Sequence, residues 1–291
     1  MEVSNAVRAS REDALLLPSS LSVLRVDGPD RVSWLNGLVT CDVTKLIPGR
    51  AMYGLVVEKK GKILSDLLLA STEEAILIGA PRERASAVLD VFDHHLIMES
   101  CEIARVHESM QAVWGPRAAE RVAGRASVEH DRSGHGGVIV VLPEGDEPAF
   151  RETFPGVVAS PEGATAARVA AGVPAFGVDF GIDTYPQEAS LEHVAVSFTK
   201  GCYMGQEVVF MLQNRGRAKR RLVRLRLDAP AGAQAAVVSE AGDPLGDLTS
   251  AAVVEGVPLG LAMVRAKAPD GARVVVRGAS GDVGATVELL R

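Results

Sequence analysis

The sequence predicts an α+β protein with a separate C-terminal β unit. In residues 1–216, apolar runs of strand length alternate with segments whose apolar residues recur at helical spacing. After Gly216 the pattern changes to short β-prone runs separated by Gly and Pro, which is typical of a small barrel or sandwich. A chain of 291 residues has room for roughly two domains. We therefore expect one domain over 1–216 and a second over 217–291.

The first strands and the first helix follow from local pattern. Leu21–Val26 alternates apolar and polar side chains, which favours a strand, and the Gly-Pro-Asp sequence at 28–30 suits the start of a helix. Ala51–Glu58 and Ile63–Ala70 are apolar runs joined by a glycine-containing turn, which is typical of a hairpin.

The elements that follow alternate in type, and Gly and Pro mark their ends. In chain order we expect a strand at Ala75–Ile78, a helix opening at Pro81, a strand at Val138–Leu142, a loop or linker at Pro143–Ser160, and helices at Thr165–Ala171 and Gly205–Asn214. The C-terminal unit is expected to contain strands around Val223–Leu227 and at Ala235–Val238, Leu259–Val264 and Arg273–Arg277.

Composition excludes several classes of protein. With 31 Lys+Arg and 37 Asp+Glu the formal net charge is −6, which argues against a dedicated nucleic-acid binder. No apolar run approaches the roughly 20 residues that span a bilayer, and the N-terminus lacks the basic and apolar regions of a signal peptide. Three scattered cysteines without a C-x-x-C pair exclude a disulfide scaffold and a self-sufficient cluster site. We expect a cytoplasmic protein with reduced cysteines and no membrane partner.

The segment richest in chemistry is KGCYMGQE at residues 200–207. Two glycines bracket Cys202 immediately before a predicted helix, and Lys200 lies nearby. A thiol close to a helix N-terminus and a lysine can be reactive or ligate a metal. The same residues are also compatible with a buried structural cysteine in a tight turn, because free cysteine is often simply part of a core.

This segment gives the chain its resemblance to a known family. KGCYMGQE, followed by Asn-Arg-Gly at 214–216 and Arg-Arg-Leu at 220–222, resembles the signature of the YgfZ family. These proteins are folate-binding relatives of the glycine-cleavage aminomethyltransferase that assist iron–sulfur protein maturation. The stretches VDGPDRVSWLNGL, GRAMYGLVVEKKGKILSD, AGVPAFGVDF, PQEASLE and GDLTSA fall in the family's order, so the resemblance covers most of the chain.

The resemblance implies a fold and a set of partners. The expected fold is an aminomethyltransferase-like ring of three parts around a central folate site: two α+β parts, one inserted into the other at about 46–110, and the C-terminal β-barrel. The implied ligand is tetrahydrofolate or a derivative, with no stable metal of the protein's own. The implied partners are iron–sulfur client or assembly proteins, including enzymes that modify tRNA.

The resemblance also implies roles for individual residues. Cys202 is the expected functional thiol and a transient ligand for iron or sulfur, shared with a partner because one cysteine cannot hold a cluster. Lys200 and Asp66 complete the expected chemical group. The residues implied in folate binding are Asp66, Glu188, Tyr203, Gln206, Glu207 and Arg215.

Three positions depart from the family pattern. The aminomethyltransferases carry an Asp-Asp pair where this chain has Ser65 and Asp66, which weakens the transferase interpretation. Ala170 stands where many relatives have an acid, and Met211 where many have an arginine. Cys202 within KGCYMGQE and the missing first Asp at Ser65 favour an accessory folate-binding factor for iron–sulfur enzymes as the leading hypothesis. Ala170 and Met211 keep open a scaffold that has lost its ligand.

Other functions stay open at this point. The runner-up is a folate-dependent aminomethyltransferase or other one-carbon transferase. The chain could also be a scaffold that has lost its ligand. The basic run at 215–226 is compatible with an anion site for a folate tail, with RNA contact or with a solvated strand face. We do not expect nucleic acid as a partner, because the run lacks the aromatic residues on which bases stack.

Overall fold

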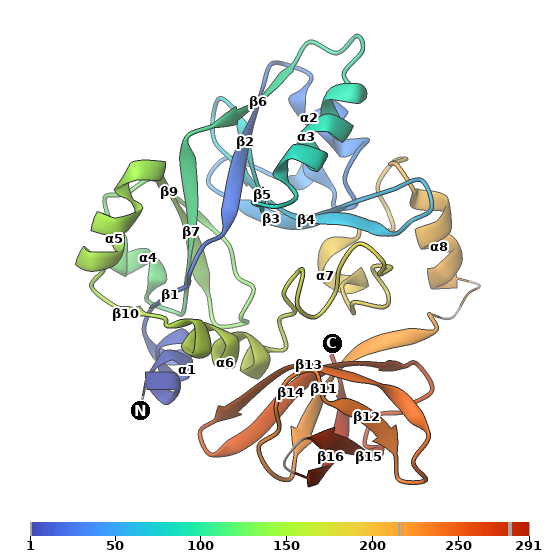
Figure 1. The fold of residues 1–291 in the computed structure, drawn as a ribbon. Helices are drawn as coiled ribbons and strands as arrows, with labels where there is room; N and C mark the ends of the chain where they lie inside the picture. The colour runs from blue at the N-terminus through green and yellow to red at the C-terminus, as the bar shows by residue number, and fades with distance from the viewer. Residues whose placement is uncertain (1, 215, 217, 279–280, 291) are drawn as a thin grey trace.

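The chain builds two open β-sheets and one closed barrel (Figure 1). The structure is a computed structural model and describes residues 2–214, 216, 218–278 and 281–290. The two sheets and their helices form an α+β body, and the barrel forms the C-terminal part. The predicted α+β class with a C-terminal β-barrel is confirmed.

The first sheet joins segments that are far apart in sequence. Its strands, in the spatial order β10-β1-β7-β9-β8, are β10 (Val157–Val158), β1 (Leu15–Leu16), β7 (Glu108–Trp114), β9 (Gly137–Pro143) and β8 (Ser127–Glu129). Apolar residues of α4 (Ala118–Arg121) and α5 (Glu147–Thr153) share a core cluster with β7 and β9. A 3₁₀ turn, Glu144–Asp146, leads into α5.

The second sheet is inserted in the chain between β1 and β7. Its order is β3 (Ala51–Val57), β4 (Ile63–Ser71), β5 (Ile76–Pro81), β2 (Leu21–Asp27) and β6 (Glu102–Val106), with every neighbouring pair antiparallel. α2 (Arg31–Asn36), the 3₁₀ turn Val43–Lys45 and α3 (Ala85–His94) share a large core with it. A separate cluster joins Val23, Leu68 and Leu77 of this sheet to Met110 and Ile139 of the first. The two sheets therefore pack against each other.

The barrel closes in the order β11-β14-β13-β12-β15-β16. Its strands are β11 (Arg220–Leu227), β12 (Ala236–Ser239), β13 (Pro244–Val254), β14 (Val257–Arg265), β15 (Arg273–Gly278) and β16 (Gly281–Leu289). Alternating residues of β11, namely Val223, Leu225 and Leu227, point into its apolar core, as the period-two pattern requires.

A buried ion pair connects the barrel to the rest of the molecule. Asp179 pairs with Arg168 of α6 (Pro161–Ala171) and also accepts hydrogen bonds from the hydroxyls of Thr249 and Ser250 on β13. Its carboxylate further accepts the backbone N–H of Ala175. Breaking a buried pair of this kind leaves an uncompensated charge, at a cost of about 3–5 kcal/mol, so this junction fixes the barrel's position.

Several local predictions need correction. The expected loop at Pro143–Ser160 contains α5 and β10, because Phe150 of α5 and Phe154, which directly follows the helix, pack in the core of the first sheet. The helix expected to open at Pro81 begins at Ala85, since Pro81 is the last residue of β5. Helix α1 (Glu2–Glu12) and strands β13 and β16 were not among the expected elements.

Glycine fixes the contact between α8 (Gln206–Asn214) and the hairpin of β3 and β4. Gly205, which precedes α8, has a φ of +75°, and a Cβ there would collide with the carbonyl oxygen of Glu58. Gly61, in the hairpin turn, approaches Val208 of α8 in the same way. These two glycines let the backbone segments approach closely.

We expect Gly205→Ala to lower the free energy of unfolding by about 1–3 kcal/mol, because it adds both backbone strain and a collision. Urea unfolding followed by circular dichroism measures the change. Gly201→Ala is the matched control: no heavy atom in the described part of the chain lies within 4 Å of its added Cβ. Equal effects of the two substitutions would contradict this account of Gly205.

Candidate functional site

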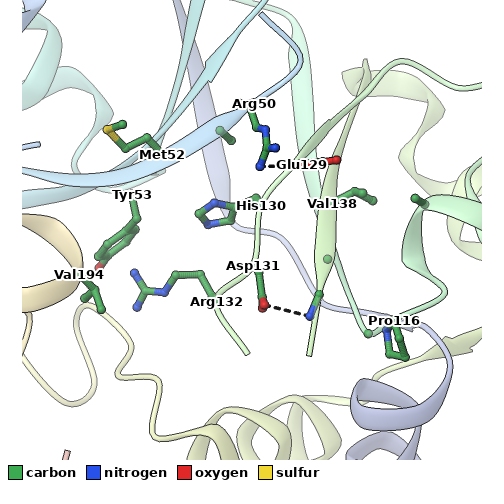
Figure 2. A pocket seen from close by; sticks show the side chains of 15 residues that line it. Arg50, Met52, Tyr53, Pro116, Glu129, His130, Asp131, Arg132, Val138 and Val194 are labelled. Atoms are coloured by element: carbon green, nitrogen blue, oxygen red, sulfur yellow. Dashed lines mark hydrogen bonds and ion pairs between the residues drawn. The ribbon is translucent and has the colours of Figure 1, made fainter. Parts of the chain in front are cut away.

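Two adjacent cavities lie where the two sheets meet. The inner one has a volume of about 180 Å³ and the outer one about 560 Å³, and both are lined by Tyr53, His130 and Arg132. The inner cavity is mainly apolar, with Leu67, Leu68, Trp114 and Ile139 among its walls. Figure 2 shows the outer cavity, where Tyr53 and Arg132 lie beside each other. The outer volume is in the usual range of small-molecule sites, about 300–1,000 Å³.

Asp66 contributes a carboxylate to the inner cavity. The antiparallel register of β3 and β4 puts Tyr53 opposite Leu68, two residues along from Asp66 and on the same face. The Tyr53 hydroxyl donates a hydrogen bond of 2.9 Å to Asp66 Oδ2. Asp66 Oδ1 is buried and has no hydrogen-bond partner among the described residues. Burial raises the pKa of Asp66 above its ordinary value, and it also raises the pKa of Tyr53.

Arg132 and His130 come from the loop between β8 and β9. The Arg132 guanidinium carbon lies 3.6 Å from the centroid of the Tyr53 ring, and Arg132 Nη1 is buried without a hydrogen-bond partner in the described chain. Burial lowers the pKa of His130 to about 4, so this imidazole is neutral near pH 7. Tyr53, His130 and Arg132 were not predicted as site residues, because none of them belongs to a recognisable short motif.

Lys200 is held by backbone carbonyls. Its Nζ donates hydrogen bonds to the carbonyl oxygens of Asn36 (2.6 Å), Val39 (2.8 Å) and Cys41 (2.7 Å). Three bonds use all the donors of an ammonium group. Burial lowers the pKa of Lys200 to about 8. This lysine therefore ties the KGCYMGQE segment to the chain after α2, and a chemical role for it stays a prediction.

The other residues of KGCYMGQE differ sharply in exposure. Cys202 is an exposed free thiol, whereas Tyr203 is buried in the cluster that also contains Leu55, Phe180 and Leu191. Gln206 and Glu207 form the first turn of α8. These four residues are absent from the described walls of both cavities. Their predicted roles in chemistry or folate binding stay predictions.

Glu188 and the basic run lie at the contact with the barrel. Glu188 is buried, pairs with Arg220 at 3.3 Å and accepts the backbone N–H of Tyr185. Arg221 lies 4.0 Å from Glu192, and Arg224 pairs with Glu288 at 2.7 Å. Much of the basic run is therefore neutralised within the protein. Arg215 lies outside the described residues, so its predicted role and that of Glu188 stay predictions.

Two of the three positions that depart from the family pattern, Ala170 and Met211, lie away from the cavities. Ala170, on α6, packs in a cluster with Val254 of the barrel, and its carbonyl accepts a hydrogen bond from Arg224. Met211 is exposed on α8. Neither is among the described residues that line the inner or the outer cavity.

The described residues contain no group of three or more His, Cys, Asp and Glu side chains arranged to hold a metal ion. None of the helices in residues 2–214, 216, 218–278 and 281–290 combines the length and the apolar character needed to cross a membrane.

Comparison with known proteins defines the class first. Residues 2–136 match the GCVT N-terminal domain, and residues 219–289 match the C-terminal β-barrel domain of CAF17. The crystal structure of glycine cleavage system aminomethyltransferase T from Bartonella henselae superposes with a TM-score of 0.83, covering 99% of this chain and 88% of that one. At 22% identity this likeness shows the fold alone. The fold is aminomethyltransferase-like, as predicted.

Relatives in sequence then indicate a particular family. A tRNA-modifying protein YgfZ from Vibrio vulnificus (strain CMCP6) is 27% identical over 239 residues, which cover 77% of this chain and 73% of the relative. A protein of the same name from Hamiltonella defensa is 27% identical over 246 residues, covering 72% and 68%. Along most of its length the chain is therefore similar to the YgfZ/CAF17 family.

The buried histidine predicts a pH dependence of stability. Because the folded pKa of His130 is about 4 and the ordinary value is 6.5, the unfolded chain binds more protons between these pH values. The contribution of His130 to the free energy of unfolding is fully present above about pH 6.5 and is lost as the pH falls to about 4. The loss amounts to on the order of 3 kcal/mol at most. His130→Gln should flatten this part of the stability curve, measured by urea unfolding from pH 7 to 4. His107→Gln, at an exposed histidine, should leave the curve unchanged, and an unaltered slope in His130→Gln would contradict the assignment.

Proposed function

We propose that this protein binds tetrahydrofolate or a derivative in the two adjacent cavities and supports the assembly or repair of iron–sulfur enzymes, including enzymes that modify tRNA. The observation that carries the folate proposal is the Asp66 carboxylate, which has one oxygen bonded to Tyr53 and the other buried in the cavity wall. Asp66, Tyr53 and Arg132 all lie within the match to the GCVT N-terminal domain.

The shape and chemistry of the cavities fit a reduced folate. A cavity of about 150 Å³ accepts one benzene ring, so the inner cavity of about 180 Å³ suits a small flat ring system between Leu67, Leu68 and Trp114. The outer cavity offers room for the remainder of the molecule. Asp66 Oδ1 would accept an N–H group of the reduced pterin, and a charge-assisted bond of this kind is stronger than a neutral one.

A carboxyl group in this environment also favours a second candidate function. Burial raises the pKa of Asp66 toward the range useful for general acid–base catalysis. The second candidate is therefore a folate-dependent one-carbon transferase. Turnover of an aminomethylated carrier protein would favour it over the accessory role.

In the accessory role, the reactive group is the thiol of Cys202, which lies on the surface and outside the described walls of the two cavities. The thiol is exposed beside α8, so a client protein can reach it without entering the cavities. Such a thiol can ligate iron or sulfur transiently while the partner supplies the other ligands. The names of the curated relatives, tRNA-modifying protein YgfZ, support a client among the enzymes of tRNA modification.

Replacing Asp66 tests the folate site. We expect Asp66→Asn to weaken tetrahydrofolate binding at least about tenfold, because the amide loses the charge that strengthens the hydrogen bond. Anaerobic isothermal titration calorimetry measures the dissociation constant. Asp282→Asn, the same change at an exposed residue of β16, is the matched control. Equal affinity in both variants would contradict the proposed site.

Replacing Cys202 tests the accessory role separately. We expect Cys202→Ala to keep the wild-type melting temperature and tetrahydrofolate affinity, since its side chain is exposed and lines neither described cavity wall. The same variant should fail to restore the modified nucleosides of tRNA in a bacterial strain that lacks its own YgfZ. Mass spectrometry of hydrolysed tRNA gives the readout. Full restoration by Cys202→Ala would overturn the proposed role of the thiol.

A further inference from the structure

The loop that carries Arg132 is stabilised by its own side chains. The Asp131 carboxylate accepts three backbone N–H groups, from Ser133 (2.9 Å), Gly134 (2.8 Å) and Gly136 (2.9 Å). The bond to Gly136 is drawn in Figure 2. These bonds fold the loop over its own acidic residue and leave the neighbouring Arg132 side chain directed at Tyr53.

Arg132 lies at the boundary of the two cavities with donor capacity left over. Its guanidinium stacks on the Tyr53 ring, and within the described chain it forms no salt bridge to a carboxylate within 4.0 Å. Nη1 is buried and lacks a hydrogen-bond partner among those residues. A buried N–H group without a partner destabilises the folded protein, and more so where the group is charged. A ligand that brings a hydrogen-bond acceptor to Arg132 Nη1 would satisfy this buried donor and so gain binding free energy.

The other wall groups make Arg132 the cation of the inner cavity. Among the described residues that line it, Arg132 is the one permanently charged base and Asp66 the one acid, because His130 is neutral at pH 7. Both contact Tyr53, Asp66 through the hydroxyl and Arg132 through the ring face. A ligand that satisfies both presents an N–H donor and an oxygen acceptor close together.

We propose that Arg132 is a ligand-binding, specificity-determining residue that donates hydrogen bonds to a carbonyl or carboxylate oxygen of the bound folate. This inference rests on the proposed folate function. In that proposal Asp66 accepts a hydrogen bond from an N–H group of the ligand, and Arg132 here donates hydrogen bonds to an oxygen of the same ligand. The pterin ring carries a carbonyl oxygen and the glutamate tail carries carboxylates, so the same chemistry has two sources within one ligand.

The test compares Arg132→Met and Arg132→Lys with wild type by anaerobic calorimetry. We expect Arg132→Met to weaken tetrahydrofolate binding at least about tenfold. Arg132→Lys should recover only part of the loss, because an ammonium lacks the planar fork of a guanidinium. Arg82→Met, at an exposed arginine in the same half of the chain, should bind as wild type does.

Tetrahydropterin, which lacks the tail, separates the two sources of the acceptor. An equal loss for tetrahydropterin and tetrahydrofolate assigns the contact to the ring carbonyl, and a loss confined to tetrahydrofolate assigns it to the tail. Thermal unfolding gives a readout independent of calorimetry. Without ligand, Arg132→Met should melt close to wild type, whereas the increase in melting temperature that tetrahydrofolate produces in wild type should be largely lost.

The outcomes distinguish this inference from the function on which it rests. Wild-type affinity of Arg132→Met for both ligands, together with weak binding by Asp66→Asn, overturns the role of Arg132 alone. Absence of binding by the wild-type protein, or wild-type affinity of Asp66→Asn, overturns the proposed folate site and this inference with it.

Discussion

The buried pair of Arg168 and Asp179 is the interaction on which the arrangement of the molecule depends. It joins α6, the segment that follows α6 and strand β13 of the barrel at a single charged point. The apolar contacts around it, such as that of Val169 with Leu222 and Leu261, are not directional. The ion pair and its hydroxyl partners supply the directional bonds. Asp179 belongs to the motif AGVPAFGVDF at 171–180, and its hydroxyl partners belong to GDLTSA at 246–251, so residues far apart in sequence meet at this carboxylate.

Much of the fold could be predicted because local pattern and packing agree. The hairpin of β3 and β4 and the alternating residues of β11 are recognisable from period and turn chemistry alone. The helix at 147–153 could not be predicted in this way: it is short, it begins in a Pro- and Gly-rich stretch, and only its contact with the first sheet stabilises it. Sheet order was equally inaccessible, since Leu15 of β1 lies opposite Trp114 of β7 on one side and Val157 of β10, much later in the chain, on the other.

The candidate site divides in the same manner. Asp66 could be identified from its place in a motif, and the structure adds that its carboxylate faces a cavity shared with Tyr53. Arg132 and His130 could not be identified from the sequence, because neither belongs to a motif. Arg132 stands out only because its buried Nη1 has no hydrogen-bond partner among the described residues, and His130 only because burial lowers its pKa. Lys200 shows the opposite case. Its motif indicates chemistry, and the structure shows that its donors are bonded to three backbone carbonyls.

The insertion of the second sheet between β1 and β7 has a consequence for synthesis on the ribosome. The two-residue strand β1 pairs with β7 on one side and with β10 on the other, and β10 begins only at Val157. At about 5–20 residues per second, β1 waits on the order of ten seconds for its last partner to be translated. The inserted sheet, whose strands all lie within residues 21–106, is complete well before then. We therefore expect the inserted sheet to fold first in the nascent chain, and the first sheet to assemble afterwards against its surface.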